Sequence, residues 1–252
     1  MPPLLPYLSP TIPTPKFLNM PSFPLTQQRL TLMQLADSFF PSGSFTLSHG
    51  MEAMVQRQHI TSAPEVEEFL RLLLHNRVGS SDLVALVHAY RASVAQDLTE
   101  VYRADRCLFA QTVIQETREA QCKTGQALLM VAQSVWVDAQ LEDLQTAIEA
   151  EQTPGCHPVI FAVVGRAGEL DEGDVLLAYL HNFVTGLVGA AIRLGVLGHL
   201  RAQQLLHNLS SDLLTIATQA QITPLSEMWS CTPAIDIAQM SHRQLQARQF
   251  VN

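Results

Sequence analysis

One adjacent pair of side chains, Cys156-His157, has the types that bind transition metals, and it lies in a short break between two prolines. Thiolate and imidazole are ligands of Zn²⁺ and Ni²⁺, and one such pair from each of two chains would complete a four-ligand site at a dimer interface. Most such pairs are ordinary loop residues, however. His181 lies in an apolar segment, and His49 and His59 have no third ligand near them in the sequence. We therefore predict no resident metal and no cofactor, and keep a nickel carrier using Cys156 and His157 as the alternative.

Two further patterns bear on catalysis. Residues 41–45, PSGSF, are similar to the glycine-flanked serine of hydrolases, but no strand precedes them and no helix follows directly. Lys123-Thr124-Gly125 has the residue types of a nucleotide-phosphate loop in the wrong order, and the sequence lacks G-x-x-x-x-G-K-[ST] and H-E-x-x-H. A hydrolase with Ser44 or Cys156 as nucleophile is the second alternative. The sequence predicts that the protein is not an enzyme.

The elements that must position these residues are helices. Apolar residues recur at helical spacing in most of the chain, and no hairpin signal, βαβ alternation or solenoid repeat is present. Thr26, Ser62 and Ser81-Asp82 have the types that begin helices. Residues 159–164 fit either a strand or a buried helix. The predicted helices cover residues 26–37, a short stretch after Gly50, 62–74, 81–94, several within 98–151, 175–197, 200–220 and 235–248.

This pattern predicts an all-α, single-domain bundle of about ten helices around the central apolar helix at 175–195. Gly125 falls inside a helical stretch, where glycine costs about 1 kcal/mol relative to alanine, so we expect close packing there. Gly186, Gly189 and Ala190 form a face of small residues that would let another helix approach. Phe45, in the loop before Gly50, is expected to anchor that loop in the bundle.

The amino-acid composition limits the cellular location and the classes of ligand that we expect for this protein. Val175 to Leu197 is long enough to span a bilayer, but polar and charged residues interrupt it, so we predict a core helix and no membrane association. A net charge of −8 argues against nucleic acid. Four scattered cysteines favour free thiols and a cytoplasmic location. Eight of the fourteen prolines fall in residues 1–24, which predicts a disordered or extended tail before a domain at 25–252.

Residues 32–52, LMQLADSFFPSGSFTLSHGME, resemble the N-terminal signature of the urease accessory protein F (UreF) family. The signature loop positions are Pro41, Gly43, Phe45, Gly50 and Glu52. Three further blocks are similar in order: residues 116–129, the core segments at 157–161 and 182–198, and residues 233–250. Ser44 replaces the usual second glycine, and Leu47 stands where an aromatic residue or histidine is common. The resemblance covers residue 27 to the end.

The resemblance implies a helical, often dimeric protein without catalytic chemistry. Members of the family join the accessory protein UreD (UreH in some organisms) and the GTPase UreG on apo-urease for nickel insertion. These proteins are the partners we expect, together with a homodimer. Glu116 and Arg118, whose charges otherwise fit a solvated face, would engage the GTPase.

The C-terminal tail, 241–252, has few apolar residues and would fray alone. The resemblance implies that it docks on UreD/UreH, with Arg243, Arg248 and Phe250 as contacts. In this interpretation Arg248 pairs with a carboxylate or carbonyl of the partner, and Phe250 enters an apolar pocket there. The alternative is a tail that packs on its own bundle.

Overall fold

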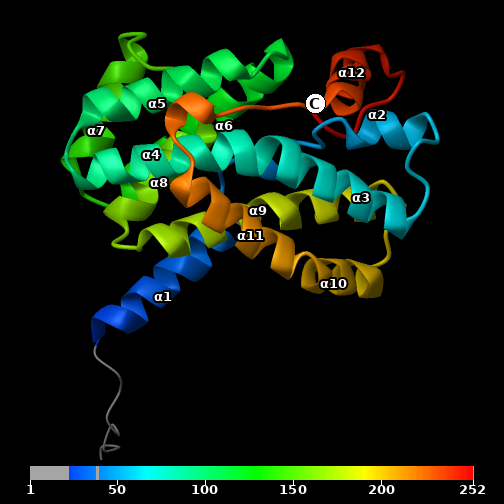
Figure 1. The fold of residues 1–252 in the computed structure, drawn as a ribbon, viewed down its shortest axis with the longest axis horizontal. Helices are drawn as coiled ribbons and strands as arrows, with labels where there is room; N and C mark the ends of the chain where they lie inside the picture. The colour runs from blue at the N-terminus through cyan, green and yellow to red at the C-terminus, as the bar shows by residue number, and fades with distance from the viewer. Residues whose placement is uncertain (1–22, 38–39, 252) are drawn as a thin grey trace, which may run out of the picture.

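A computed structural model describes residues 23–37 and 40–251, and these contain helices and no strand (Figure 1). The predicted all-α, single-domain fold is confirmed. The α-helices are α1 (Phe23–Ala36), α2 (Met51–Gln56), α3 (Ala63–Leu73), α4 (Leu83–Val94), α5 (Leu98–Gln111), α6 (Gln115–Val135), α7 (Ala139–Glu149), α8 (His157–Ala167), α9 (Glu172–Arg193), α10 (His199–Asn208), α11 (Ser210–Ile222) and α12 (Pro233–Ser241). Short 3-10 turns cover Ser44–Thr46, Leu225–Glu227 and His242–Gln244.

The centre of the core is formed by α4 and α8, with α5, α6 and α9 packed around them. Residues 83–87 of α4 and 159–164 of α8 are almost completely buried. The segment 159–164, which fitted either a strand or a helix, is therefore a helix surrounded by other helices. The apolar segment forms α9, and most of its length is covered by the chain itself, as expected for a core helix. By length and composition alone, α9 is the only helix in the described ranges that could cross a membrane.

Ser81 and Asp82 do not begin a helix as the sequence predicted. A π-helical segment, Leu74–Asp82, joins α3 to α4 without a break, and Asp82 has helical backbone angles. A π turn leaves carbonyls without their usual partners. The Ser80 carbonyl accepts a hydrogen bond from the Trp229 amide at 3.1 Å, and the Asn76 carbonyl accepts one from Cys231 at 2.8 Å. Two backbone hydrogen bonds thus tie the segment before α12 to the π segment.

The glycine within α6 is tightly packed, whereas two glycines of α9 have open space around them. A Cβ at Gly125 would collide with the Gly155 carbonyl oxygen and lie 2.9 Å from the His157 amide nitrogen, so the predicted close packing is confirmed. A Cβ at Gly186 or Gly189 would have no neighbouring atom within 4 Å. In the described residues the two glycines are thus open and able to receive another helix, whereas Ala190, the third residue of that face, is buried.

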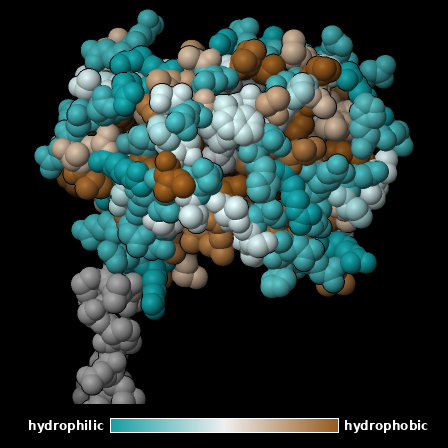
Figure 2. Space-filling view, in the orientation of Figure 1, coloured by the Kyte–Doolittle hydropathy of each residue, from teal (hydrophilic) through white to brown (hydrophobic). Residues whose placement is uncertain are grey.

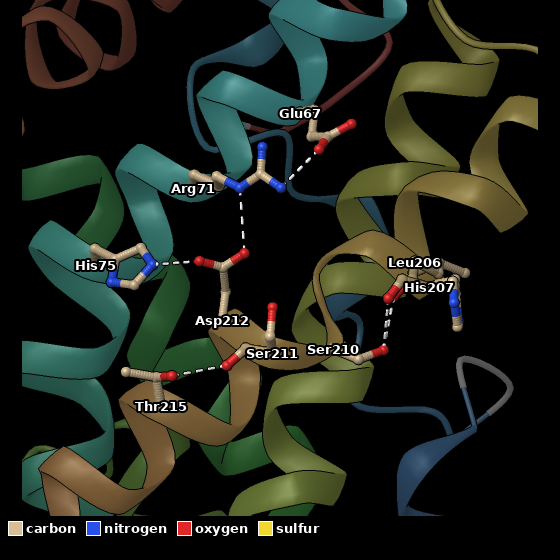
Figure 3. A network of polar contacts seen from close by, with 9 residues as sticks. All are labelled: Glu67, Arg71, His75, Leu206, His207, Ser210, Ser211, Asp212 and Thr215. Atoms are coloured by element: carbon tan, nitrogen blue, oxygen red, sulfur yellow. Dashed lines mark hydrogen bonds and ion pairs between the residues drawn. The ribbon is translucent and has the colours of Figure 1, made fainter.

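The predicted helix at 200–220 is two helices that meet at Leu209. The Ser210 hydroxyl donates to the His207 carbonyl at 2.8 Å, which competes with regular helix bonding at the joint (Figure 3). Asp212 then fixes α11 against α3 and the π segment. Its carboxylate accepts from Arg71 Nε at 3.2 Å and lies 2.8 Å from His75 Nε2 (Figure 3).

Two element boundaries differ from the sequence prediction. Helix α1 begins at Phe23, inside the predicted tail, because a proline is tolerated in the first helical turn. Residues 1–22 of that tail lie outside the described residues. The last helix ends at Ser241 instead of 248, because His242 turns inward and the chain folds back.

Polar side chains cover most of the face drawn in Figure 2, and apolar ones form small separate patches.

Candidate functional site

The signature loop between α1 and α2 is built on two left-handed glycines. Gly43 has φ of 80° and begins the turn at Ser44–Thr46, and Gly50 has φ of 87° and caps α2. Gly50 is also in tight contact with α12, since a Cβ there would lie 3.2 Å from both the Gln239 amide nitrogen and the Ile235 carbonyl oxygen. Both positions therefore favour glycine, and Gly50 places the loop directly against α12.

Glu52 is the centre of this arrangement. Its side chain is 1% exposed, and its carboxylate accepts three hydrogen bonds from the C-terminal segment. The donors are His242 Nε2 at 2.7 Å, the Gln249 amide at 2.7 Å and the Phe250 amide at 3.3 Å. A buried carboxylate requires such partners, because an unpaired charge in the interior is costly. The start of α2 thus holds the end of the chain.

The expectation that the tail is ordered mainly by a partner is contradicted by its contacts within the chain. Phe250 is 5% exposed, and its ring lies under the Arg193 guanidinium at 4.4 Å. Arg193 also donates to the Phe45 carbonyl at 2.6 Å, and the Val251 amide donates to the Thr46 carbonyl at 3.0 Å. Phe250 therefore already occupies an apolar position in its own chain and is not free to enter a partner's pocket. Arg248 remains exposed.

Phe45 does not anchor the loop in the core, contrary to the prediction. Its side chain is 50% exposed, whereas Phe40 and Leu47 of the same loop are buried. The reason is the turn at Ser44–Thr46, in which Phe45 contributes its carbonyl to Arg193 and directs its ring to the surface. Pro41 is exposed as well.

Glu116 and Arg118, the two charged residues expected to engage the GTPase, lie on two sides of α6. Thr117 between them is buried and bonds the Gln239 side chain of α12. Glu116 forms an ion pair with Arg243 of the tail, 2.7 Å from Oε1 to Nε, and Arg118 lies over the Phe109 ring of α5 at 5.2 Å. The structure therefore brings Glu116 and Arg243 together, which spacing in the sequence did not indicate, and separates Arg118 from both.

A cavity of about 40 Å³ lies beneath the signature loop, and its walls come from the loop, the π segment, α6, α8 and α9. Such a volume suits one or two water molecules. Asp82 accepts hydrogen bonds from Gln121 and Tyr179, each at 3.3 Å. Burial raises the pKa of Asp82, while Arg77 and these hydrogen bonds oppose the rise. Arg77 also lines a second cavity of about 90 Å³ that lies against Val113 and Asp236.

Two histidines face this cavity in their neutral form. Burial lowers the pKa of His49 to about 3, with smaller contributions from Arg77 and His157, and burial lowers the pKa of His157 to about 4. His49 Nδ1 is buried without a hydrogen-bond partner in the described residues. The rings pack on aromatic neighbours, His49 on Phe183 and His157 on Phe161 and Tyr179. Sequence reasoning missed this cavity, because its residues come from five distant segments.

The arrangement around the candidate nucleophiles and metal ligands does not form a reactive centre. The Ser44 hydroxyl donates to Asn182 Oδ1 at 3.3 Å, an amide that cannot act as a base. Cys156 is fully buried, its amide donates to Asp105 at 2.8 Å, and its thiol points to the Asp105 carbonyl. Within the described ranges, no three His, Cys, Asp or Glu side chains are grouped to hold a metal ion.

Comparison with known proteins gives one consistent result. The family model described as UreF matches residues 60–210. The urease accessory protein UreF of Trichodesmium erythraeum (strain IMS101) is 50% identical over 225 residues, which cover 89% of this chain and 97% of the relative. The urease accessory protein UreF 1 of Brucella melitensis biotype 1 is 29% identical over 88% of this chain and 92% of its own length. The urease accessory protein UreF of Actinobacillus pleuropneumoniae serotype 5b is 29% identical over 88% of this chain and 97% of its own length.

Proposed function

Because the chain belongs to the UreF family of urease accessory proteins, we propose that it is a non-catalytic scaffold that joins UreD/UreH and the GTPase UreG on apo-urease during nickel insertion. The chain itself supplies no nucleotide-phosphate loop, so the GTPase activity belongs to a separate protein. Its contribution to nickel insertion is to hold the other components in position.

The observation that carries the proposal is the surface around the ion pair between Glu116 and Arg243, which we name the α6–α12 surface. It consists of Val113, Glu116, Ile237, Met240 and Arg243. Val113, Ile237 and Met240 are 79%, 62% and 59% exposed, respectively. Exposed apolar side chains beside charged ones are typical of surfaces that bind proteins. The surface includes the start of α6 and α12, two of the segments that resemble the family's blocks.

The sequence led us to expect Glu116 at the GTPase together with Arg118. Because Glu116 pairs with Arg243 of the tail, we now assign it with this surface to UreD/UreH, and we assign the GTPase to the other side of α6, where Arg118 lies. Arg243 and Arg248 follow α12 and are both exposed, so they remain available to a partner although Phe250 is held within the chain. Arg118 lies over Phe109 on the side of α6 that faces α5, where a guanidinium can still pair with an acidic group of the GTPase.

We also propose that the protein is a homodimer. A Cβ at Gly186 or Gly189 would meet no atom of the described residues within 4 Å, so α9 is open there, and a shallow hollow formed by α1 and α9 lies between Met33 and His181. A second copy would cover the 69% exposed Met33. Light scattering tests this part, and a monomer at all protein concentrations contradicts it.

A pull-down experiment tests the scaffold. The tagged chain is mixed with UreD/UreH, UreG and apo-urease, and retained proteins are quantified. We expect Arg118→Ala to reduce retention of UreG, and Glu116→Arg together with Arg243→Ala to reduce retention of UreD/UreH. Glu142→Gln, an exposed acidic residue on α7, is the matched control and is expected to retain both. Equal retention by all variants contradicts the assigned surfaces, and failure of the unaltered chain to retain either partner contradicts the scaffold.

A further inference from the structure

The packing of α6 on α8 brings two of the four free cysteines together. The break before α8 lies against α6 at Gly125, where a Cβ would collide with the Gly155 carbonyl oxygen and lie 3.0 Å from the Cys156 carbonyl carbon. Cys122 is one helical turn before Gly125, so its side chain lies on the same face of α6. Cys122 packs against the core from a half-buried position, and Cys156 is part of the core. The two thiols are therefore neighbours across the contact between the helices.

The two thiols differ in their readiness to react. The neighbouring Cys156 side chain lowers the pKa of Cys122, and Arg118, one turn earlier on α6, acts in the same direction, while burial and Asp105 oppose them. The contact with Cys122 and burial raise the pKa of Cys156 well above its ordinary value. A thiolate is the reactive form of cysteine. Cys122, which is only half-buried, is thus the thiol that reacts first with an oxidant, and the buried Cys156 lies protected beside it.

We propose that Cys122 and Cys156 form a dithiol site that peroxide oxidises to an intramolecular disulfide, which ties α6 to the start of α8. The Cys122 thiolate attacks one oxygen of hydrogen peroxide, the O–O bond breaks, and the leaving hydroxide takes up a proton to form water. Cys122 is now a sulfenic acid. The Cys156 sulfur attacks it, the S–O bond breaks as the S–S bond forms, and the proton of Cys156 leaves with the hydroxide as a second water. Two thiols are oxidised and one peroxide is reduced.

The surroundings of Cys156 allow this change without unfolding the break before α8. Asp105 holds the break through the Gly155 and Cys156 amides at 2.6 and 2.8 Å and through the Thr153 hydroxyl at 2.6 Å. None of these bonds uses the thiol. The thiol's own contact with the Asp105 carbonyl is long, at 3.9 Å, so little is lost when the sulfur turns toward Cys122.

Removing the other two cysteines gives a variant in which formation of this disulfide can be tested. Cys107 and Cys231 are replaced by serine, so that only Cys122 and Cys156 remain. The folded double variant is treated with hydrogen peroxide, then unfolded without reductant and alkylated with iodoacetamide. We expect the number of alkylated thiols to fall from two to none and the intact mass to fall by two hydrogens. Proteolysis should give one peptide pair joined through Cys122 and Cys156, which dithiothreitol separates.

The matched control is Cys122→Ser in the same background, in which Cys156 should stay reduced at the same peroxide dose because it is buried. Two results overturn the proposal. One is oxidation of Cys122 to sulfinic acid while Cys156 is still fully alkylated. The other is recovery of both thiols at a peroxide dose that oxidises Cys231 in the unaltered protein, where that exposed thiol serves as an internal standard.

Discussion

Replacing Glu52 with glutamine should loosen the C-terminal segment from the fold. The substitution preserves the size of the side chain but removes its charge and exchanges one acceptor oxygen for an NH₂ group. The native carboxylate accepts from His242 Nε2 and from the amides of Gln249 and Phe250, all within a buried site. An amide has one acceptor oxygen for these three donors, so at least one buried donor loses its partner.

The expected decrease in the free energy of unfolding follows from these contacts. Leaving one buried donor unpaired costs about 1–3 kcal/mol, and the bonds that remain lose their charge assistance, which adds about 1 kcal/mol. The free energy of unfolding should therefore fall by about 2–4 kcal/mol. For a chain of this size that corresponds to a melting temperature lower by roughly 4–16 °C. A chain that ends after His242 loses Phe250 and its Arg193 contact as well, and is expected to melt lower still.

Urea unfolding followed by circular dichroism measures the change, with Glu100→Gln as control. Glu100 is an exposed partner of Arg103 one turn away, and such pairs contribute about 0–1 kcal/mol. If Glu52→Gln and Glu100→Gln unfold at the same urea concentration, the Glu52 contacts do not hold the tail and the reasoning is refuted. The reasoning is also refuted if the chain that ends after His242 has the same melting temperature as the unaltered protein.

Gly125→Ala should destabilise the protein by about 1–3 kcal/mol, because the new methyl group meets the Gly155 carbonyl. Gly189→Ala, where α9 is open, should instead stabilise the protein by up to about 1 kcal/mol. If the two variants shift the midpoint of urea unfolding equally, the packing described for these glycines is contradicted. Phe45→Ala should cost only about 1 kcal/mol in thermal unfolding, since half of the ring is exposed, and a loss of 3 kcal/mol or more would contradict its surface position. Ser44→Ala should leave urease activation intact in a coupled assay, and complete loss of activation by the folded variant would favour the enzyme alternative. In the folded protein, burial lowers the pKa of His49 from 6.5 to about 3. As the pH falls below 6.5, the unfolded chain therefore binds a proton at His49 before the folded chain does. The contribution of the neutral ring to the free energy of unfolding is complete above pH 6.5 and is lost toward pH 3. His49→Gln should therefore show a smaller drop in unfolding free energy between pH 7 and pH 5 than the unaltered protein.

The sequence predicts helices well where their periodicity is strong, and it fails where a distant contact overrides a local preference. Ser81 and Asp82 have the residue types of a helix start, yet they continue a helix because Asp82 is held by Gln121 and Tyr179 from other elements. Gly125 was correctly interpreted, because a glycine within a helix needs a local reason. Gly186 and Gly189 predicted a face that another helix can approach, but the sequence did not indicate whether that helix belongs to the core or to a second copy.

The candidate site was predictable in its segments and not in its contacts. The loop, the start of α6 and the tail were all identified, but the pairing of Glu116 with Arg243 and of Glu52 with the tail joins residues more than a hundred positions apart. The tail was expected to be loose because it has few apolar residues. One buried carboxylate and one cation–π contact hold it instead, and neither leaves a periodic pattern in the sequence.

The scaffold function is tested most directly by measuring nickel in urease after reconstitution. Apo-urease, UreD/UreH, UreG, GTP and nickel are combined with and without this chain, and the nickel content and activity of the reisolated urease are determined. We predict that both rise only when the chain is present, and that the chain alone binds no GTP and hydrolyses none. Full nickel content and activity without the chain, or GTP hydrolysis by the chain alone, would contradict the account.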